Sequence, residues 1–272
     1  MNEPTLCFIG AGNMASAMIG GLIAGGFAPS RITACDIDAS ALQRLAGQFG
    51  ILPAQDAQQA ARSADCVILA VKPQVMQKVC TSLDDIAHQP LFISIAAGLR
   101  STDIDRWLGG NRAVVRCMPN TPALVRLGAS GLFANDRVDT VRKDLAESIM
   151  HSTGITVWVD DEAQLDAVTA ISGSGPAYFF LFIEALQQAG QDLGLEPRTA
   201  QALARQTALG AATMALDADA ADLRRKVTSP GGTTEQAIAS FSRDGLSECV
   251  ARATRAAYDR SVELADVLAR GD

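Results

Sequence analysis

The sequence has few of the residues that carry hydrolytic or metal-dependent chemistry. Only two histidines occur in 272 residues, His88 and His151, and neither lies near cysteines or acidic residues at metal-ligand spacing. The six cysteines are scattered and form no C-x-x-C pair. We therefore expect no metal site, no Ser-His-Asp triad, and buried free thiols in a reducing compartment.

Long apolar runs and an excess of positive charge are also missing. The formal net charge of -7 argues against binding to nucleic acid or to an anionic membrane surface. The most apolar stretch, residues 177–183, ends at Glu184 and is too short to span a bilayer. No signal peptide pattern is visible at the N-terminus. We expect a cytoplasmic protein. The negative net charge does not exclude a small anionic substrate.

The strongest motif lies at the start of the chain. An apolar run typical of a buried strand ends at Gly10, and apolar residues at helical spacing begin after Gly12. A strand, a turn and a helix in this order fit the G-x-G-x-x-G/A motif, in which phosphates bind the free amides at the helix N-terminus. We predict a dinucleotide cofactor on Gly10, Ala11, Gly12, Asn13, Met14 and Ala15.

Strand and helix patterns alternate through the first half of the chain. The run at residues 65–71 is apolar almost throughout, which is typical of a strand covered on both faces. Further strands are expected at residues 31–35, 91–95, 113–117 and 155–159, and helices at 40–48, 75–82, 101–107 and 138–150. The pattern predicts an α/β fold, with residues 1–160 forming a doubly wound, mostly parallel Rossmann-type sheet that binds NAD(P).

Three strand ends carry residues suited to contact a ligand, because ligands of such sheets bind beyond the carboxyl ends of the strands. Lys72, one of only four lysines, follows the central strand. A solvated lysine and simple turn chemistry are the alternatives. The predicted cofactor contacts at these ends are Ala70, Val71, Lys72, Pro73, Ala97, Gly98 and Asn120.

Cofactor choice is expected to depend on Asp36, at the end of the second strand. A carboxylate there accepts hydrogen bonds from the ribose hydroxyls and repels a 2′-phosphate, so it favours NADH. An Asp at this position also suits a turn or helix cap. The sequence therefore predicts NADPH or NADH, with a weak preference for NADH.

Beyond residue 160 the strand pattern disappears and the chain is expected to be helical. The helices expected at residues 176–193 and 197–216 are apolar or alanine-rich on nearly every face. A domain of this size can hardly enclose two such helices by itself. We predict that residues 161–272 form an all-helical substrate-binding and dimerisation domain, and burial within one chain is the alternative.

Two glycine-rich junctions precede helices in this second half. One leads through Ser174 into the first apolar helix, and the other occupies residues 228–234, where Thr233 and Gln236 fit a capping box. Such junctions present free backbone amides and hydroxyls that suit a carboxylate. The predicted substrate-binding residues are Ser174, Ser229, Gly231, Gly232, Thr233 and Thr234.

Over its whole length the chain resembles the pyrroline-5-carboxylate reductase family. The resemblance rests on FIGAGNMASAMIGG at the N-terminus, AVKP at 70–73, SIAAG at 94–98, RCMPNTPA at 116–123, SGSGPAY at 172–178 and VTSPGGTT at 227–234. It implies reduction of the cyclic imine 1-pyrroline-5-carboxylate to L-proline by NAD(P)H, the last step of proline biosynthesis. It also implies a helical domain intertwined with that of a second copy, sites shared between two chains, and often a ring of five dimers.

The resemblance further implies roles for the loop before the late helix. Backbone amides at residues 231–234 would bind the substrate carboxylate, and the Thr234 hydroxyl would bond the ring nitrogen, which makes Thr234 the expected catalytic residue. Because this loop has no His or Lys, we expect the imine to be bound protonated or to take its proton through Thr234 and water.

Two other functions compete with this interpretation. A hydroxyacid dehydrogenase of the same plan would need a lysine on a helix of the second domain, and none occurs between Lys143 and Lys226. A non-catalytic nucleotide-binding protein would not need the loop at residues 229–234, which is present. Both alternatives are therefore disfavoured.

Overall fold

The computed structural model describes residues 3–270, and its contacts divide the chain into two compact units. Among the described residues, unit 1 comprises residues 3–174 and 257–270, and unit 2 comprises residues 175–256. Helix α12 (Leu246–Arg270) begins in unit 2 and ends in unit 1. This division follows contacts alone, and the functional boundary expected between residues 160 and 161 stays a prediction.

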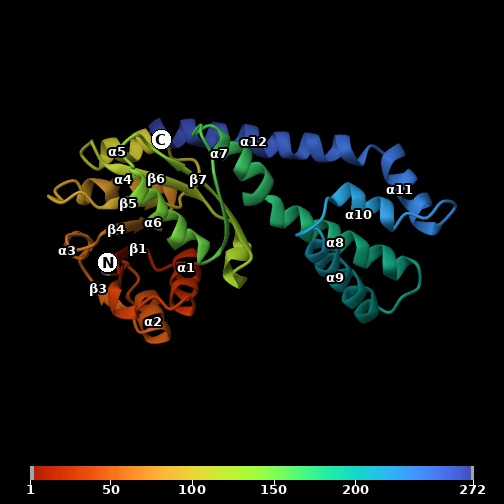
Figure 1. Ribbon diagram of the computed structural model, residues 1–272, viewed down its shortest axis with the longest axis horizontal. Helices are drawn as coiled ribbons and strands as arrows, with labels where there is room; N and C mark the ends of the chain where they lie inside the picture. Colours follow the sequence, from red (N-terminus) through yellow and green to blue (C-terminus); the bar gives the residue numbers. More distant parts are fainter. Residues whose placement is uncertain (1–2, 271–272) are drawn as a thin grey trace. The chain divides into compact units, whose positions relative to one another are not determined.

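Unit 1 is built on an eight-stranded sheet with the order β3-β2-β1-β4-β5-β6-β7-β8 (Figure 1). All neighbouring strands pair in parallel except β6 and β7. The predicted doubly wound, mostly parallel sheet is therefore confirmed. The strands are β1 (Leu6–Ile9), β2 (Ile32–Cys35), β3 (Leu52–Ala54), β4 (Cys66–Leu69), β5 (Leu91–Ser94), β6 (Ala113–Met118), β7 (Gly128–Ala134) and β8 (Gly154–Trp158).

Helices cover both faces of this sheet. Successive strand residues point to opposite faces, so Phe8 belongs to the core under α1, α2 and α6, whereas Ile9 belongs to the core under α3, α4 and α5. Burial on both sides is why the central strands are apolar throughout. The helices of unit 1 are α1 (Asn13–Ala24), α2 (Ala39–Phe49), α3 (Ala57–Ala61), α4 (Pro73–Ser82), α5 (Ser101–Trp107), α6 (Thr140–His151) and α7 (Gln164–Val168), with short turns η1 (Pro29–Arg31) and η2 (Thr121–Val125).

Strand β7 was not expected from the sequence. Its residues GASGLFA are mostly small and have weak strand propensity. Hydrogen bonding to β6 and β8 stabilises this segment as a strand despite its weak propensity. In the antiparallel ladder with β6, Leu132 lies opposite Cys117. Gly131 is needed here because a Cβ built on it would stand 2.7 Å from Cγ1 of Val168.

Unit 2 is entirely helical, which confirms the predicted fold class of the second half. Besides the first part of α12 it contains α8 (Gly175–Asp192), α9 (Pro197–Met214), α10 (Ala220–Lys226) and α11 (Thr233–Arg243). On α8, Phe179, Phe180 and Leu181 are each 65% exposed or more. A single chain therefore leaves a large apolar face of α8 in contact with solvent. Among the described residues, no helix combines the length and hydropathy that a membrane crossing requires.

Candidate functional site

The loop between β1 and α1 turns tightly at Gly10. This residue has a φ of +112°, and a Cβ built on it would stand 2.4 Å from the carbonyl oxygen of Ala70. Its amide donates to the carbonyl of Cys35 at 2.8 Å. Only glycine fits this place, where the ends of β1, β2 and β4 meet.

The N-terminus of α1 is free to receive an anion. Gly12 is the N-cap, no side chain caps the helix, and the first turn holds no acidic residue. A Cβ built on Gly12 meets nothing within 4 Å, so open space lies against the loop. The free amides of the first turn and the helix dipole suit a pyrophosphate, and the residues present therefore fit a dinucleotide.

Asp36, predicted to bind the ribose, also has a structural use. Its Oδ2 accepts a hydrogen bond from the Ala11 amide at 2.6 Å, and its Oδ1 accepts one from the Asp38 amide at 2.8 Å. The carboxylate thus ties the glycine loop to the end of β2. Each oxygen retains a further lone pair, and contact with the ribose stays a prediction.

Beside Asp36 opens a cavity of about 340 Å³ with a largely apolar lining. One wall is a face of α4 on which lining residues recur at i, i+3, i+4 and i+7. Such a cavity, next to the phosphate-binding loop, suits an adenosine. The sequence interpretation missed the lining residues Ile37, Gln55, Val75, Lys78, Val79 and Ser82. The last four lie on α4, where their spacing was a usable signal.

The thiol of Cys35 forms part of this cavity. Burial above all, and then the nearby carboxylates of Asp36 and Asp56, raises its pKa above the ordinary value of 9.0. The thiol therefore stays neutral at physiological pH and acts as an apolar part of the wall.

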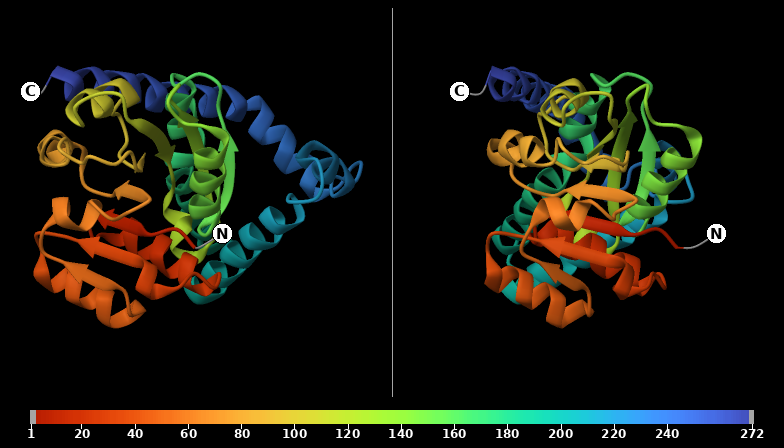
Figure 2. Two further views of the ribbon diagram at one scale, coloured as in Figure 1. Left: turned by 60° about the vertical axis from the view of Figure 1, so that its left-hand side comes forward. Right: turned by 90° about the vertical axis from the view of Figure 1, so that its left-hand side faces the viewer.

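The other predicted strand ends differ in their surroundings. Val71 lines the cavity beside Asp36, whereas Lys72 is exposed and is the N-cap of α4, with Pro73 in the first turn. Gly98 has a φ of +74°, and a Cβ built on it would stand 3.3 Å from Cδ1 of Leu268 on α12. The last part of α12 therefore packs on the loop after β5, beside α5 (Figures 1 and 2).

Asn120, another predicted cofactor contact, is buried and bonded at both ends of its amide. Its Oδ1 accepts from the Ala129 amide at 2.9 Å, and its Nδ2 donates to the Ser172 carbonyl at 3.0 Å. The side chain thus joins the end of β6 to β7 and to the segment before α8. Its contact with a cofactor stays a prediction.

Ser174, a predicted substrate residue, follows a π-helical turn, η3 (Thr169–Gly173). The Ser174 amide donates to the Thr169 carbonyl at 2.8 Å, five residues back. A Cβ built on Gly173 would stand 2.5 Å from Cε of Met118, so the glycine leaves room for the end of this methionine side chain. The sequence predicted helix beyond residue 160 but no π-helical turn within it. Turns of this kind are uncommon and are frequent at functional sites.

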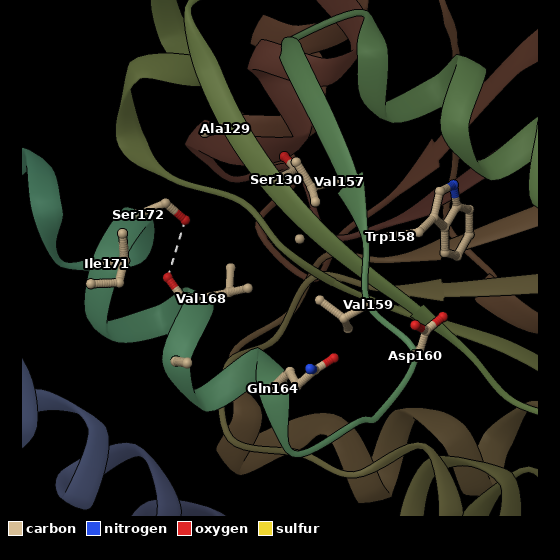
Figure 3. A pocket seen from close by; sticks show the side chains of 12 residues that line it. Ala129, Ser130, Val157, Trp158, Val159, Asp160, Gln164, Val168, Ile171 and Ser172 are labelled. Atoms are coloured by element: carbon tan, nitrogen blue, oxygen red, sulfur yellow. Dashed lines mark hydrogen bonds between the residues drawn. The ribbon is translucent and has the colours of Figure 1, made fainter. Parts of the chain in front are cut away.

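A second cavity, of about 570 Å³, lies between β7, β8 and the segment α7–η3 (Figure 3). Val159 and Val168 approach it from the strand and helix sides, and Ser172 Oγ donates to the Val168 carbonyl at 3.1 Å (Figure 3). None of the predicted site residues lines this cavity, so it is separate from the predicted cofactor site.

In unit 2, the loop before α11 differs from its prediction in one respect. The N-cap is Gly232, with no side-chain cap, so the predicted capping box of Thr233 and Gln236 is wrong. Instead, Oε2 of Glu235 accepts from the Gly231 amide at 2.7 Å, and the Gly232 amide donates to the Ser229 carbonyl at 3.0 Å. Of the four predicted amides, two are used internally, and those of Thr233 and Thr234 lie in the uncapped first turn.

No group of three or more His, Cys, Asp or Glu is placed to hold a metal ion among residues 3–270. All six cysteines are free thiols, and Cys249 alone among them is exposed. The chemistry that the two units offer consists of backbone donors, hydroxyls and an apolar cavity.

Comparison with known proteins gives matches over both units. Residues 5–98 match a family model described as NADP oxidoreductase, coenzyme F420-dependent, and residues 162–264 match one described as pyrroline-5-carboxylate reductase dimerisation. The pyrroline-5-carboxylate reductase of Pseudomonas aeruginosa is 51% identical over 98% of this chain and 99% of its own length.

Solved structures agree with these matches. A pyrroline-5-carboxylate reductase from Coxiella burnetii superposes with a TM-score of 0.94 at 47% identity, covering 97% of this chain and 99% of its own. The pyrroline carboxylate reductase of Plasmodium falciparum, solved with NADP bound, gives a TM-score of 0.85 at 29% identity over 97% and 99% of the two chains.

Proposed function

The chain belongs to the pyrroline-5-carboxylate reductase family, and from this premise we propose that it reduces 1-pyrroline-5-carboxylate to L-proline with NADPH or NADH. The observation that carries the proposal is the 51% identity to a named reductase over nearly the full length of both chains. This relationship includes the helical half, which generic dinucleotide-binding folds do not share.

Unit 1 would hold the cofactor. The free amides at the start of α1 would receive the pyrophosphate, and the cavity beside Asp36 would receive the adenosine. The strand ends at Lys72 and Ala97 would line the nicotinamide side, whereas Val71 lines the cavity assigned to the adenosine. The hydride comes from the bound nicotinamide, and the protein contributes binding and orientation.

Unit 2 would hold the substrate. Because the Gly231 and Gly232 amides already have partners, we assign the substrate carboxylate to the amides of Thr233 and Thr234. The dipole of α11 favours a negative charge at this end. Ser229 would add a hydroxyl donor, and Gly231, with a φ of +71°, shapes the loop. Ser174 belongs to unit 1, and its contact with the substrate stays a prediction.

The imine carbon accepts hydride more readily when the ring nitrogen is protonated. The described residues of the loop before α11 include no histidine or lysine that could supply this proton. We assign to the Thr234 hydroxyl a hydrogen bond with the ring nitrogen, which orients the ring and connects it to water.

The match to a dimerisation model indicates a homo-oligomer. We propose that the dimer forms through unit 2 and covers the exposed face of α8, where Phe179 is 70% exposed. We also propose a ring of five dimers. A cytoplasmic location is proposed because all six cysteines are free thiols. Light scattering on the purified chain tests the proposed assembly, and a monomeric, active protein would contradict it.

An activity assay tests the reaction itself. Purified protein is mixed with 1-pyrroline-5-carboxylate and either NADPH or NADH, and the loss of absorbance of the reduced nicotinamide is followed while L-proline is quantified. We expect one proline for each nicotinamide oxidised. Cofactor binding without turnover would instead favour a nucleotide-binding protein, and turnover only with hydroxyacids and oxidised cofactor would favour a dehydrogenase.

A further inference from the structure

Two asparagines bridge opposite ends of the strand pair β6 and β7. At one end, Asn120 accepts from the Ala129 amide at 2.9 Å, and at the other end Asn135 accepts from the Val114 amide at 3.1 Å. Each side chain also donates through Nδ2 to a backbone carbonyl at 3.0 Å. The two residues thus make the same kind of bridge, and they differ in which carbonyl they hold.

The carbonyl held by Asn135 belongs to Arg112, directly before β6, so that bridge stays within the strand pair. The carbonyl held by Asn120 belongs to Ser172, 52 residues away in the π-helical turn η3. A π-helix bonds each amide to the carbonyl five residues back, as Ser174 does with Thr169. This pattern departs from that of the α-helices α7 and α8 on either side, and contacts from outside the helix can favour it.

Two contacts from the end of β6 meet this turn. Asn120 bonds to the carbonyl of Ser172, and Met118 packs against Gly173, whose missing side chain makes room for its Cε. The contacted residues, Ser172 and Gly173, lie within two residues of Ser174. The end of β6 is therefore the part of the sheet that holds the last turn before α8.

The orientation of the Asn120 amide follows from its partners. Oδ1 faces an N–H donor and Nδ2 faces a carbonyl, and exchanging them would set donor against donor and oxygen against oxygen. The residue is 9% exposed. Its polar atoms are thus engaged with backbone groups inside unit 1.

We propose that Asn120 is a positioning residue for the substrate, which acts by holding η3 so that Ser174 keeps its place, and that it is not a cofactor-binding residue. The proposal rests on the proposed function, because it takes Ser174 as part of the substrate site. It assigns to this asparagine a role different from the cofactor contact expected from its place at a strand end.

The test compares Asn120→Asp with Asn135→Asp. Each change keeps the size of the side chain and its acceptor oxygen, but replaces the Nδ2 donor by an oxygen that repels the carbonyl it faced. Asn120→Ala, which introduces no charge, serves if Asn120→Asp does not fold. For each variant we measure kcat and KM for 1-pyrroline-5-carboxylate, the Kd of NADPH by fluorescence titration, the Tm, and amide hydrogen exchange over residues 169–175.

We expect Asn120→Asp to raise KM for the imine about tenfold and to speed exchange over residues 169–175 about tenfold, while the Kd of NADPH changes less than about twofold. The two variants should lower Tm by similar amounts, but Asn135→Asp should leave both KM and this exchange unchanged. Weaker NADPH binding with an unchanged KM would overturn the proposal in favour of a cofactor contact. Equal effects of the two variants on KM and on exchange over residues 169–175 would also overturn it, since they would indicate a structural role alone.

The proposed function and this inference fail in different ways. If the unmutated chain does not reduce the imine, the proposed function is wrong, and the assay shows this before any variant is made. Hydrogen exchange still decides whether Asn120 holds η3. Unchanged exchange over residues 169–175 in Asn120→Asp would overturn the inference whatever the activity.

Discussion

The carboxylate of Asp36 accepts the backbone amide of Ala11 at 2.6 Å, so the residue at the end of β2 fixes the loop that opens α1. A side chain expected to select the cofactor therefore also shapes the loop expected to bind the pyrophosphate. The other oxygen of this carboxylate, Oδ1, accepts a hydrogen bond from the Asp38 amide. Any change at Asp36 is expected to alter both cofactor preference and the stability of this loop.

Asp36→Asn should shift cofactor preference towards NADPH. The change removes the negative charge that would face a 2′-phosphate while keeping one acceptor for the loop, and we expect the ratio of the NADH to NADPH affinities to fall on the order of tenfold. Fluorescence titration of the free protein with each nucleotide measures this ratio. Asp139→Asn, which loses the capping carboxylate of α6, is the control and should leave the ratio unchanged. An unaltered ratio in Asp36→Asn would show that Asp36 serves only the loop.

Gly10→Ala and Gly12→Ala should separate stability from binding. At Gly10 a Cβ would stand 2.4 Å from a carbonyl oxygen at a φ of +112°, so we expect a loss of about 2 kcal/mol or more in the free energy of unfolding. At Gly12 the φ is -76° and nothing lies within 4 Å, so the stability should hold while a methyl group enters the expected pyrophosphate space. Urea unfolding and NADPH titration check both variants. Full NADPH affinity in Gly12→Ala would contradict the phosphate assignment.

Thr234→Ala should lower kcat without changing cofactor binding. Loss of the hydroxyl removes the expected hydrogen bond to the ring nitrogen, and we expect kcat to fall about tenfold or more while the Kd of NADPH stays the same. Thr234→Ser restores the hydroxyl and should recover most of the rate. Thr254→Ala, on α12 in unit 2, controls for the general loss of a threonine, since its hydroxyl bonds only to backbone carbonyls in the described structure. A Thr234→Ala enzyme with normal kcat would rule out the assigned role.

Three buried thiols should make the fold sensitive to alkali. Burial raises the pKa of Cys7, of Cys80 and of Cys117 to about 12, from an ordinary value of 9.0. Below pH 9 both the folded and the unfolded chain keep these protons. Above it the unfolded chain loses them first, so the free energy of unfolding falls by about 1 kcal/mol per pH unit for each thiol.

Cys80→Ala removes one of these thiols, so its stability should fall less steeply with pH than that of the unmutated chain. Urea unfolding at pH 8, 9 and 10 gives the two slopes. The variant starts from a lower stability because a buried group is lost from the core under α4. The slope and not the starting value is therefore the test, and equal slopes would contradict the shifted pKa.

Parts of the fold that depend on local pattern were predictable. The apolar run of β4, the glycines before α1, and the helix at 101–107 each follow from residues near in sequence, and the structure places them where expected. Strand β7 was missed because its small residues become a strand only through pairing with β6 and β8. The π-helical turn was missed because it depends on Met118 and Asn120, about 50 residues away.

The candidate site divides in the same way. Glycines at positions 10 and 12 were identified because a motif with fixed spacing needs them there. The hydrogen bond from the Gly231 amide to Glu235 was not foreseen, since a Glu at this position fits more than one capping pattern. The use of Asp36 by the Ala11 amide required the fold to bring two loops together.

The order of the candidate motifs along the chain was thus determined by the sequence alone: an expected phosphate-binding loop first, then strand ends proposed for a nicotinamide, then a helical half with a loop proposed to bind a carboxylate. Spacing and residue type are enough for this, because each motif works through backbone groups a few residues apart. Only the tertiary structure decided which polar atoms in those motifs are already engaged. The Ala11 amide lies 25 residues from Asp36 and the Ser172 carbonyl lies 52 residues from Asn120, and hydrogen bonds over such separations form only when the sheet and its loops are assembled.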